Sequence, residues 1–319
     1  MDSSNLSIGI GLSSEEHGPL TIVEQARAAL DHGFDEMAVT DHYHPWVDEQ
    51  GHSPFVWSVL GALSQLDGVA LGTAVTCPTM RIHPAVIAQA AATTSLLTGG
   101  RFWLGVGTGE NLNEHILGDR WPPATERLAM LGEAVEVLRL LWQGGERSFD
   151  GDHYVVEDAR LYDLPDEPPK IMMSAFGPAA ARVAAEVADG LVTTGPDAET
   201  ISVYRDNGGT GDVTTLAKIC WDEDEARARA TYHRLWPTSG VPGQLSQDLR
   251  TPALFEQAIQ TVRLEDSVGD TPVGPDPEPY VAQLRDLAEA GVTRVYIQQV
   301  GPDQERAYRF LRDEVLPKL

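Results

Sequence analysis

The feature of this sequence that most constrains its fold is the regular alternation of strand-like and helix-like segments. Short apolar runs, typical of buried strands, are separated by longer segments with apolar residues at helical spacing. The strand-like runs lie at 6–12, 36–40, 69–75, 102–106, 170–173, 190–193, 216–221 and 292–298. Such alternation predicts parallel strands with helical crossovers, and this number of units predicts an α/β fold of the closed (β/α)8 TIM-barrel type.

The segments between these runs complete the prediction. Helices are expected at 20–32, 52–66, 84–97, 126–142, 179–188, 224–235, 279–290 and 304–316, with a short hairpin near 154–156. Residues 237–276 are rich in Gly, Pro, Ser and Asp, and we expect there an insertion with one weak helix near 253–262, within a single domain of residues 1–319. An open doubly wound sheet is the competing fold, but residues 8–14 lack the third glycine of its phosphate-binding turn.

The charge of the chain excludes several classes of partner. A net charge of −25 and a pI near 4.5 argue against binding to nucleic acid or to anionic membrane surfaces. The sequence has no long apolar run and no signal-peptide pattern, so a cytoplasmic location is expected. Arginine carries almost all positive charge, which fits either a salt-adapted cytoplasm or a GC-rich genome. Cys77 and Cys220 are expected to be reduced core thiols.

Unusual polar residues follow the second predicted strand. Asp41, His42 and Trp46 leave its carboxyl end together, and in a barrel such ends open on the face that holds the site. His42 could cap a turn, but beside a carboxylate it is better suited to act as a general base. Trp46 could be a core residue, or it could cover a flat ring or stabilise a cation. No third ligand stands near His42 and His44, so no metal site is predicted.

A second polar loop follows the fourth predicted strand. Gly107, Thr108 and Gly109 could form a simple tight turn, or their backbone could approach a flat cofactor and its phosphate closely. Glu110 follows directly and would lie beside whatever the glycines hold. Both loops belong to the same face of the predicted barrel, so we expect them to meet over one ligand.

Several motifs together resemble a known family. They lie at 41–46, 71–75, 84–89, 104–114, 149–154 and 188–190. In these motifs the chain resembles the bacterial-luciferase-like superfamily of flavin and deazaflavin barrels. Within that superfamily it is similar to the glucose-6-phosphate dehydrogenases that use the deazaflavin coenzyme F420. The resemblance covers nearly the whole chain and weakens after about Pro237.

The resemblance implies roles for individual residues. His42 would take the hydroxyl proton of a substrate, Trp46 would stabilise the developing charge, and Glu110 would serve the far side of the cofactor ring. Glu15 and Thr194 would lie near the substrate. A non-proline cis peptide would join Ala74 to Val75, and the protein would be a homodimer. The implied cofactor-binding residues are Asp41, Ala74, Val75, Gly107, Thr108, Gly109, Asn113, Ala175, Phe176 and Gly177.

One departure from the family bears on the substrate. The family holds the sugar phosphate with basic residues, whereas this chain has no lysine between Lys218 and Lys318 and has Asp197 about where a cation is expected. A phosphate dianion needs positive partners or clustered N–H donors. We therefore predict an F420-dependent dehydrogenase for an uncharged alcohol or sugar and not for glucose 6-phosphate. The alternatives are an FMN-dependent luciferase-like monooxygenase, a reductase that uses reduced F420, and a non-catalytic cofactor-binding barrel.

Overall fold

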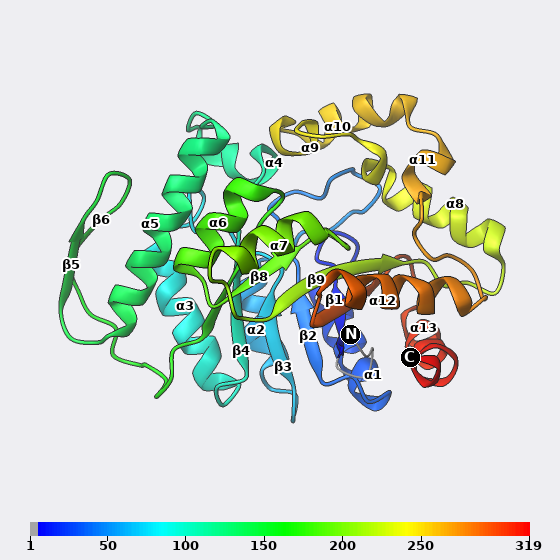
Figure 1. The fold of residues 1–319 in the computed structure, drawn as a ribbon, viewed down its shortest axis with the longest axis horizontal. Coiled ribbons are helices and arrows are strands. Elements are labelled where there is room, and N and C mark those ends of the chain that lie inside the picture. Colours follow the sequence, from blue (N-terminus) through cyan, green and yellow to red (C-terminus); the bar gives the residue numbers. More distant parts are fainter. Residues whose placement is uncertain (1–5) are drawn as a thin grey trace.

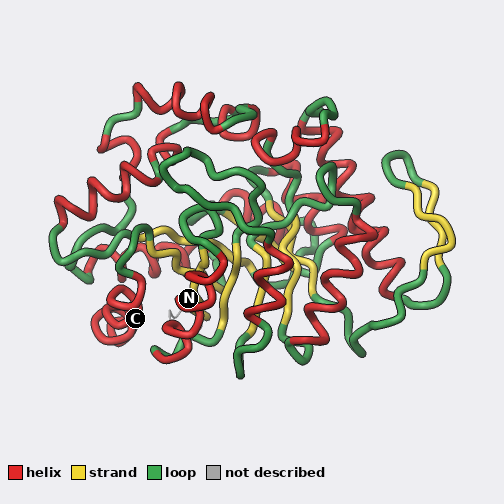
Figure 2. Tube along the Cα trace, turned by 180° about the vertical axis from the view of Figure 1, so that it is seen from behind, coloured by secondary structure: helices red, strands yellow, loops and turns green. Residues whose placement is uncertain are grey.

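The computed structural model describes residues 6–319 and contains a closed barrel of parallel strands with helices around it (Figures 1 and 2). The order around the barrel is β1-β10-β9-β8-β7-β4-β3-β2, so the predicted (β/α)8 barrel is confirmed. The barrel strands are β1 (Ser7–Leu12), β2 (Glu36–Val39), β3 (Ala70–Thr73), β4 (Phe102–Val106), β7 (Lys170–Ser174), β8 (Gly190–Thr193), β9 (Val213–Ile219) and β10 (Arg294–Gln299).

The main hydrophobic core lies between the barrel and the helices that surround it. These helices are α1 (Pro19–Asp31), α2 (Val56–Leu63), α3 (Pro84–Leu97), α5 (Ala124–Trp142), α6 (Pro178–Val187), α7 (Ala198–Asp206), α12 (Glu278–Ala290) and α13 (Gln304–Phe310). Among residues 6–319, no helix combines the length and the apolar character that a membrane crossing requires.

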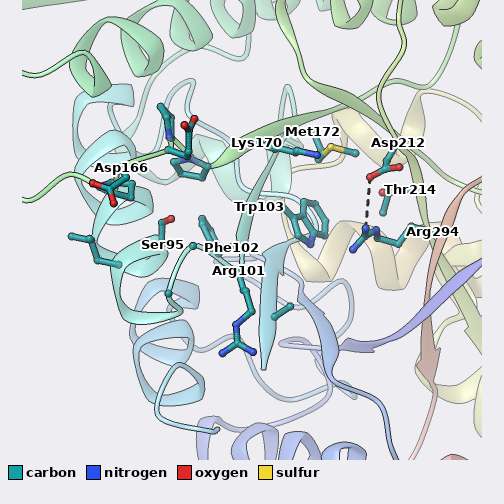
Figure 3. Close-up of a pocket in the computed structure, with 18 residues that line it drawn as sticks. Ser95, Arg101, Phe102, Trp103, Asp166, Lys170, Met172, Asp212, Thr214 and Arg294 are labelled. Carbon is teal, nitrogen blue, oxygen red and sulfur yellow. Dashed lines mark ion pairs between the residues drawn. The ribbon is translucent and has the colours of Figure 1, made fainter. Parts of the chain in front are cut away.

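Aromatic rings fill the middle of the barrel. Trp103 and Tyr296 lie with ring centroids 5.5 Å apart, and the indole Nε1 donates to the Tyr296 hydroxyl at 2.8 Å. A Cβ atom at Gly72 would lie 1.9 Å from the Trp103 ring, so this strand position must be glycine. Below these rings Arg294 pairs with Glu36. Beside them a hollow of about 700 Å³ opens at the amino-terminal end of the strands, away from the polar loops (Figure 3).

The structure corrects several predicted boundaries. The helix expected at 52–66 is only Val56–Leu63, because Pro54 and Phe55 precede it in extended conformation. The strand expected at 216–221 is Val213–Ile219, and the closing helix becomes a π-helix at Leu311–Val315. Helix α7 was not predicted. This helix begins after Asp197, whose carboxylate accepts the backbone N–H of Thr200 at 3.0 Å.

The helix expected near 253–262 is present, but it is not the only helix within 237–276. After α8 (Glu225–Leu235) the chain forms α9 (Leu245–Asp248), α10 (Pro252–Ala258) and α11 (Leu264–Val268), with short 3-10 turns between them. Residues 237–268, here called the covering segment, arch over one end of the barrel (Figure 1). The chain then returns beside β9 through a bridge between Cys220 and Val273. The hairpin of β5 (Arg147–Asp150) and β6 (Val155–Ala159) projects from the opposite side of the molecule (Figure 1).

Candidate active site

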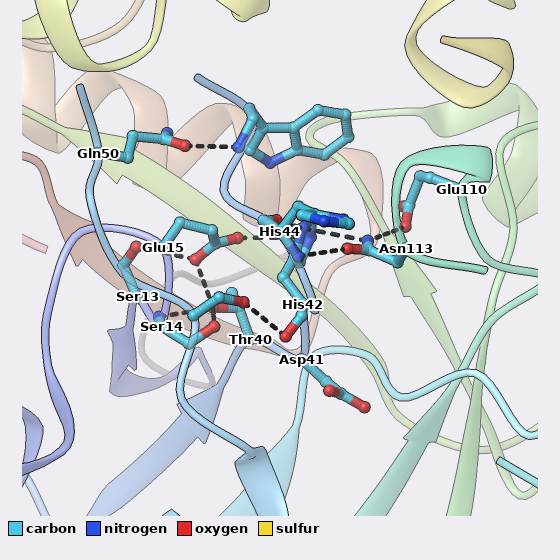
Figure 4. Close-up of polar contacts among 12 residues, drawn as sticks. Ser13, Ser14, Glu15, Thr40, Asp41, His42, His44, Gln50, Glu110 and Asn113 are labelled. Carbon is cyan, nitrogen blue, oxygen red and sulfur yellow. Dashed lines mark hydrogen bonds and ion pairs between the residues drawn. The ribbon is translucent and has the colours of Figure 1, made fainter. Parts of the chain in front are cut away.

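Glu15 and His42 form the centre of the polar cluster at the carboxyl end of the barrel (Figure 4). Oε1 of Glu15 lies 3.4 Å from Nε2 of His42, and Oε2 accepts hydrogen bonds from Ser13 Oγ at 2.9 Å and Thr40 Oγ1 at 2.6 Å. Burial alone would raise the pKa of Glu15, but His42 and the hydrogen bonds from Thr40 and Ser13 together lower it. Glu15 is therefore a buried carboxylate that faces the imidazole.

Asn113 holds the other side of the imidazole. Its Oδ1 accepts the backbone N–H groups of Tyr43 at 2.9 Å and His44 at 3.1 Å, which fixes the orientation of the amide. Its Nδ2 therefore donates, to Nδ1 of His42 at 3.1 Å and to Oε2 of Glu110 at 3.2 Å. This arrangement places the lone pair of neutral His42 at Nδ1 and its N–H toward Glu15.

The same nitrogen of His42 has a second neighbour. The carbonyl oxygen of His44 lies 3.2 Å from Nδ1, so it can accept an N–H when the ring is protonated there. The two neighbours of Nδ1 are thus an amide donor and a carbonyl acceptor. Such a setting suits a group that takes up and releases a proton.

Trp46 covers the histidine from the side of the covering segment. Its ring centroid lies 5.1 Å from that of His42, and the edge of Phe255 from α10 meets it at 5.1 Å. The backbone N–H of Trp46 donates to Gln50 Oε1 at 2.8 Å. Trp46 is therefore a packing residue that also lies against the imidazole of His42.

The glycine loop forms a surface of backbone and small side chains beside this cluster. A Cβ atom at Gly107 would lie 2.7 Å from Cγ2 of Val75 and 3.8 Å from Cβ of Ser174, so the ends of β3, β4 and β7 meet there. The predicted non-proline cis peptide between Ala74 and Val75 is present. Gly109 has a φ of +82° and lies against Glu114. A Cβ atom at either glycine would overlap with Val75 or Glu114, so both positions require glycine.

Behind the glycine loop is a buried charge cluster that the sequence analysis missed. Asp41 accepts hydrogen bonds from Thr76 Oγ1 at 2.5 Å and from Arg81 Nη2 at 2.9 Å. The backbone N–H of Arg81 donates to Glu114 Oε2 at 2.8 Å. Burial raises the pKa of Glu114 to about 7, although Arg81 opposes this shift. The sequence could have indicated this cluster, because Thr76 and Arg81 lie in the loop after the third strand, at the same end of the barrel as Asp41.

The remaining predicted residues lie at the same end of the barrel without contacting the Glu15–His42 pair. Ala175 is buried after β7, the Phe176 side chain is 59% exposed, and Gly177 precedes α6. Thr194 is exposed after β8, and Thr108 is half-buried within the glycine loop. No group of His, Cys, Asp and Glu side chains within residues 6–319 has the arrangement of a metal site.

A closed parallel barrel with its polar loops gathered at the carboxyl ends of the strands is the arrangement of TIM-barrel enzymes. The chain belongs to the luciferase-like monooxygenase family, whose model matches residues 6–294. An F420-dependent glucose-6-phosphate dehydrogenase of Nakamurella multipartita is 34% identical, over 98% of this chain and 96% of that protein. The enzyme of the same name from Mycobacterium avium is 34% identical, over 99% of this chain and 98% of the relative.

Solved structures agree with this assignment. An F420-dependent secondary alcohol dehydrogenase, solved in complex with an F420–acetone adduct, superposes with a TM-score of 0.91 at 28% identity and covers 98% of both chains. The F420-dependent tetrahydromethanopterin reductase of Methanopyrus kandleri shares the fold, with a TM-score of 0.78 at 23% identity over 98% of this chain and 99% of that one. The chain is thus grouped with F420-dependent oxidoreductases of the family.

Proposed function

We propose that this protein is an F420-dependent dehydrogenase that oxidises the CH–OH carbon of an uncharged alcohol or sugar. The similarity to F420-dependent dehydrogenases over nearly the full chain supports an oxidoreductase that uses coenzyme F420. The observation that carries the proposal is the chain of contacts from Glu15 through His42 and Asn113 to Glu110, which lies between Trp46 and the glycine loop.

The residues of the site fit a flat deazaflavin. Gly107 cannot carry a side chain without meeting Val75, and this leaves a smooth wall formed by the ends of β3, β4 and β7. Ala74, Thr108, Gly109, Asn113 and the loop 175–177 would hold the ring and its tail from this side. The carboxylate of Asp41 is already bonded to Thr76 and Arg81. Bound F420 supplies a two-electron hydride acceptor that reacts poorly with oxygen.

The proton of the substrate hydroxyl would pass to the imidazole of His42. The Glu15 carboxylate would stabilise the positive charge of the ring. The hydride would leave the same carbon, so the alcohol would become a ketone or lactone with loss of two electrons and two protons. Trp46 would shield the substrate. Glu110, which accepts the Asn113 N–H, would hold or supply a proton at the far side of the cofactor ring.

The charge at the rim after β8 supports an uncharged substrate. Asp197 is committed to the start of α7, and the exposed Thr194 just before it brings no positive charge. A sugar phosphate would need cations at this rim. A cytoplasmic homodimer remains part of the proposal through the family resemblance.

Cofactor binding is the experiment that tests the proposal. Purified protein is titrated with F420 and with FMN, and alcohols and free sugars are then screened by loss of the absorbance of oxidised F420. Tight F420 binding with reduction by a neutral alcohol or sugar is expected. His42→Ala should lower kcat by about two to four orders of magnitude and still bind F420. FMN binding with oxygen uptake, or efficient turnover of glucose 6-phosphate, would refute the proposal.

A further inference from the structure

Two nitrogen-bearing side chains, Lys218 and Gln298, lie on the floor of the barrel mouth and have no part in the steps above. The two residues are Cα partners in the register of β9 and β10. The residues on either side of Lys218, Ala217 and Ile219, belong to the core outside the barrel. Because side chains alternate along a strand, Lys218 and Gln298 point to the inside.

The ammonium group of Lys218 has no carboxylate partner. Its Nζ lies 4.1 Å from the ring centroid of Trp236, over the indole face. Across residues 6–319 none of the ion pairs closer than 4.0 Å includes this lysine, and its side chain is only partly buried. The indole face uses none of the three N–H donors in a conventional hydrogen bond. The ammonium thus remains able to donate to a bound molecule.

The amide of Gln298 is more deeply buried, and the nearest group that acts on it is the carboxylate of Glu16, whose pKa it lowers. The residue is 1% exposed, and Nε2 has no acceptor in good hydrogen-bond geometry within the described part of the chain. An unsatisfied buried donor costs about 1–3 kcal/mol, and native structures rarely leave one without a reason. A ligand oxygen between Lys218 and Gln298 would satisfy both groups.

The floor is connected to the acid–base pair through Glu16. The indole Nε1 of Trp236 donates to Glu16 Oε1 at 2.6 Å, and the Gly301 N–H donates to Oε2 at 2.8 Å. Glu16 follows Glu15 directly, and Trp46 packs against the cluster that contains Trp236. A Cβ atom at Gly11, just before this loop, would lie 3.1 Å from Cβ of Gln298. Lys218 and Gln298 therefore lie on the side of the mouth that holds Glu15.

The position on the barrel separates this floor from the glycine wall. The strand order places β9 and β10 next to β1, whereas β3, β4 and β7 lie across the barrel. Burial raises the pKa of Glu16 to about 7, so near neutral pH this neighbour carries part of a negative charge. That charge disfavours a second anion beside it, and an uncharged oxygen is the better match.

We propose that Lys218 and Gln298 bind a second, uncharged oxygen of the substrate, so that the enzyme prefers polyhydroxylated alcohols or sugars to simple alcohols. This inference rests on the proposed function and narrows its substrate class. The reacting hydroxyl lies at His42, and the second hydroxyl accepts from Lys218 Nζ and Gln298 Nε2. Both are specificity-determining residues that act away from the reacting carbon.

The test compares isopropanol with propylene glycol, which differ by a hydroxyl group, in steady-state reduction of F420. Wild-type protein is expected to have a lower KM for the glycol. Lys218→Met keeps the aliphatic stem over Trp236 and removes the donors, so the KM ratio of glycol to isopropanol should rise about tenfold, as for a lost charge-assisted hydrogen bond. Lys170→Met, at the other end of the barrel, is the control and should leave the ratio unchanged.

Two further measurements keep the inference falsifiable. Gln298→Met is nearly isosteric, so if Lys218→Met does not fold, this variant should change the KM ratio in the same direction. F420 affinity is measured for each variant by fluorescence. An affinity loss of about tenfold would assign the oxygen to the cofactor and overturn the inference. If the wild-type enzyme oxidises isopropanol and does not prefer the glycol, the inference about Lys218 and Gln298 is overturned but the proposed function stands. If the enzyme oxidises neither alcohol nor any sugar, the proposed function is overturned as well.

Discussion

Oε1 of Glu15 lies 3.4 Å from Nε2 of His42, and the two side chains are 1% and 10% exposed. At this depth the charge of one group acts on the other with little screening by solvent. The carboxylate thus faces the position at which the proposed reaction creates positive charge. This relationship makes Glu15 the first residue to change.

Glu15→Gln should lower kcat by about one to two orders of magnitude, because the amide keeps the shape of the side chain but not its charge. F420 affinity should stay the same, since Glu15 lies on the opposite side of His42 from Asn113 and Glu110. Glu305→Gln on the surface of α13 is the charge-matched control. A Glu15→Gln enzyme with the turnover of the wild type would show that the carboxylate does not support proton transfer.

Gly107→Ala should weaken F420 binding by about tenfold. The new methyl group would lie 2.7 Å from Val75 Cγ2, and an overlap of this kind costs about 1–3 kcal/mol when neighbours must shift. Gly132→Ala in α5 is the matched control, because a Cβ there meets nothing within 4 Å and should stabilise the helix. Fluorescence titration with F420 measures the first effect, and thermal unfolding measures both. Unchanged F420 affinity in Gly107→Ala would place the cofactor elsewhere.

Phe255→Ala should destabilise the covering segment by about 3–5 kcal/mol, since the ring is completely buried against Trp46, Val47 and Leu112. The variant should also raise KM, because Trp46 loses the ring that supports it. Leu254→Ala changes the adjacent residue of α10, which is 37% exposed, and should cost less than about 1 kcal/mol. Denaturant unfolding would measure the loss of stability, and steady-state kinetics would measure KM. An unchanged KM in Phe255→Ala would mean that Trp46 does not depend on the covering segment.

Glu114→Gln should change how stability depends on pH. The folded protein holds the proton of Glu114 up to about pH 7, whereas the unfolded chain releases it near 4.5. Between these values the folded state binds more protons, so this group lowers the free energy of unfolding as pH rises, by about 3 kcal/mol in total. Glutamine cannot ionise and removes this loss.

Denaturant titrations at pH 5 and pH 8 would measure the effect of Glu114→Gln. The variant should be more stable than the wild type at the higher pH and close to it at the lower one. Equal differences at both pH values would mean that the Glu114 carboxyl has the same pKa in the folded and unfolded protein. Glu305→Gln again serves as the exposed control.

The sequence predicts the barrel well because the strand and helix periods are local properties. It also predicts which loops share a face, since the carboxyl ends of the strands lie together in any such barrel. It does not reveal the cluster around Arg81, because Asp41, Arg81 and Glu114 come from three separate segments and only the closed barrel brings them together. Helix α7 was missed because Asp197 was considered as a replacement for a cation and not as a helix cap.

The covering segment contributes no strand to the barrel, yet its Phe255 supports Trp46 and its Asp248 carbonyl accepts the Asn111 side chain near the glycine loop. The covering segment is thus one continuous stretch of sequence, and the residues of the Glu15–His42 cluster come from other parts of the chain. Substitution, insertion or recombination can therefore change the covering segment and leave the residues of the Glu15–His42 cluster unchanged. Related barrels can therefore diverge in what they accept while they keep the same reaction.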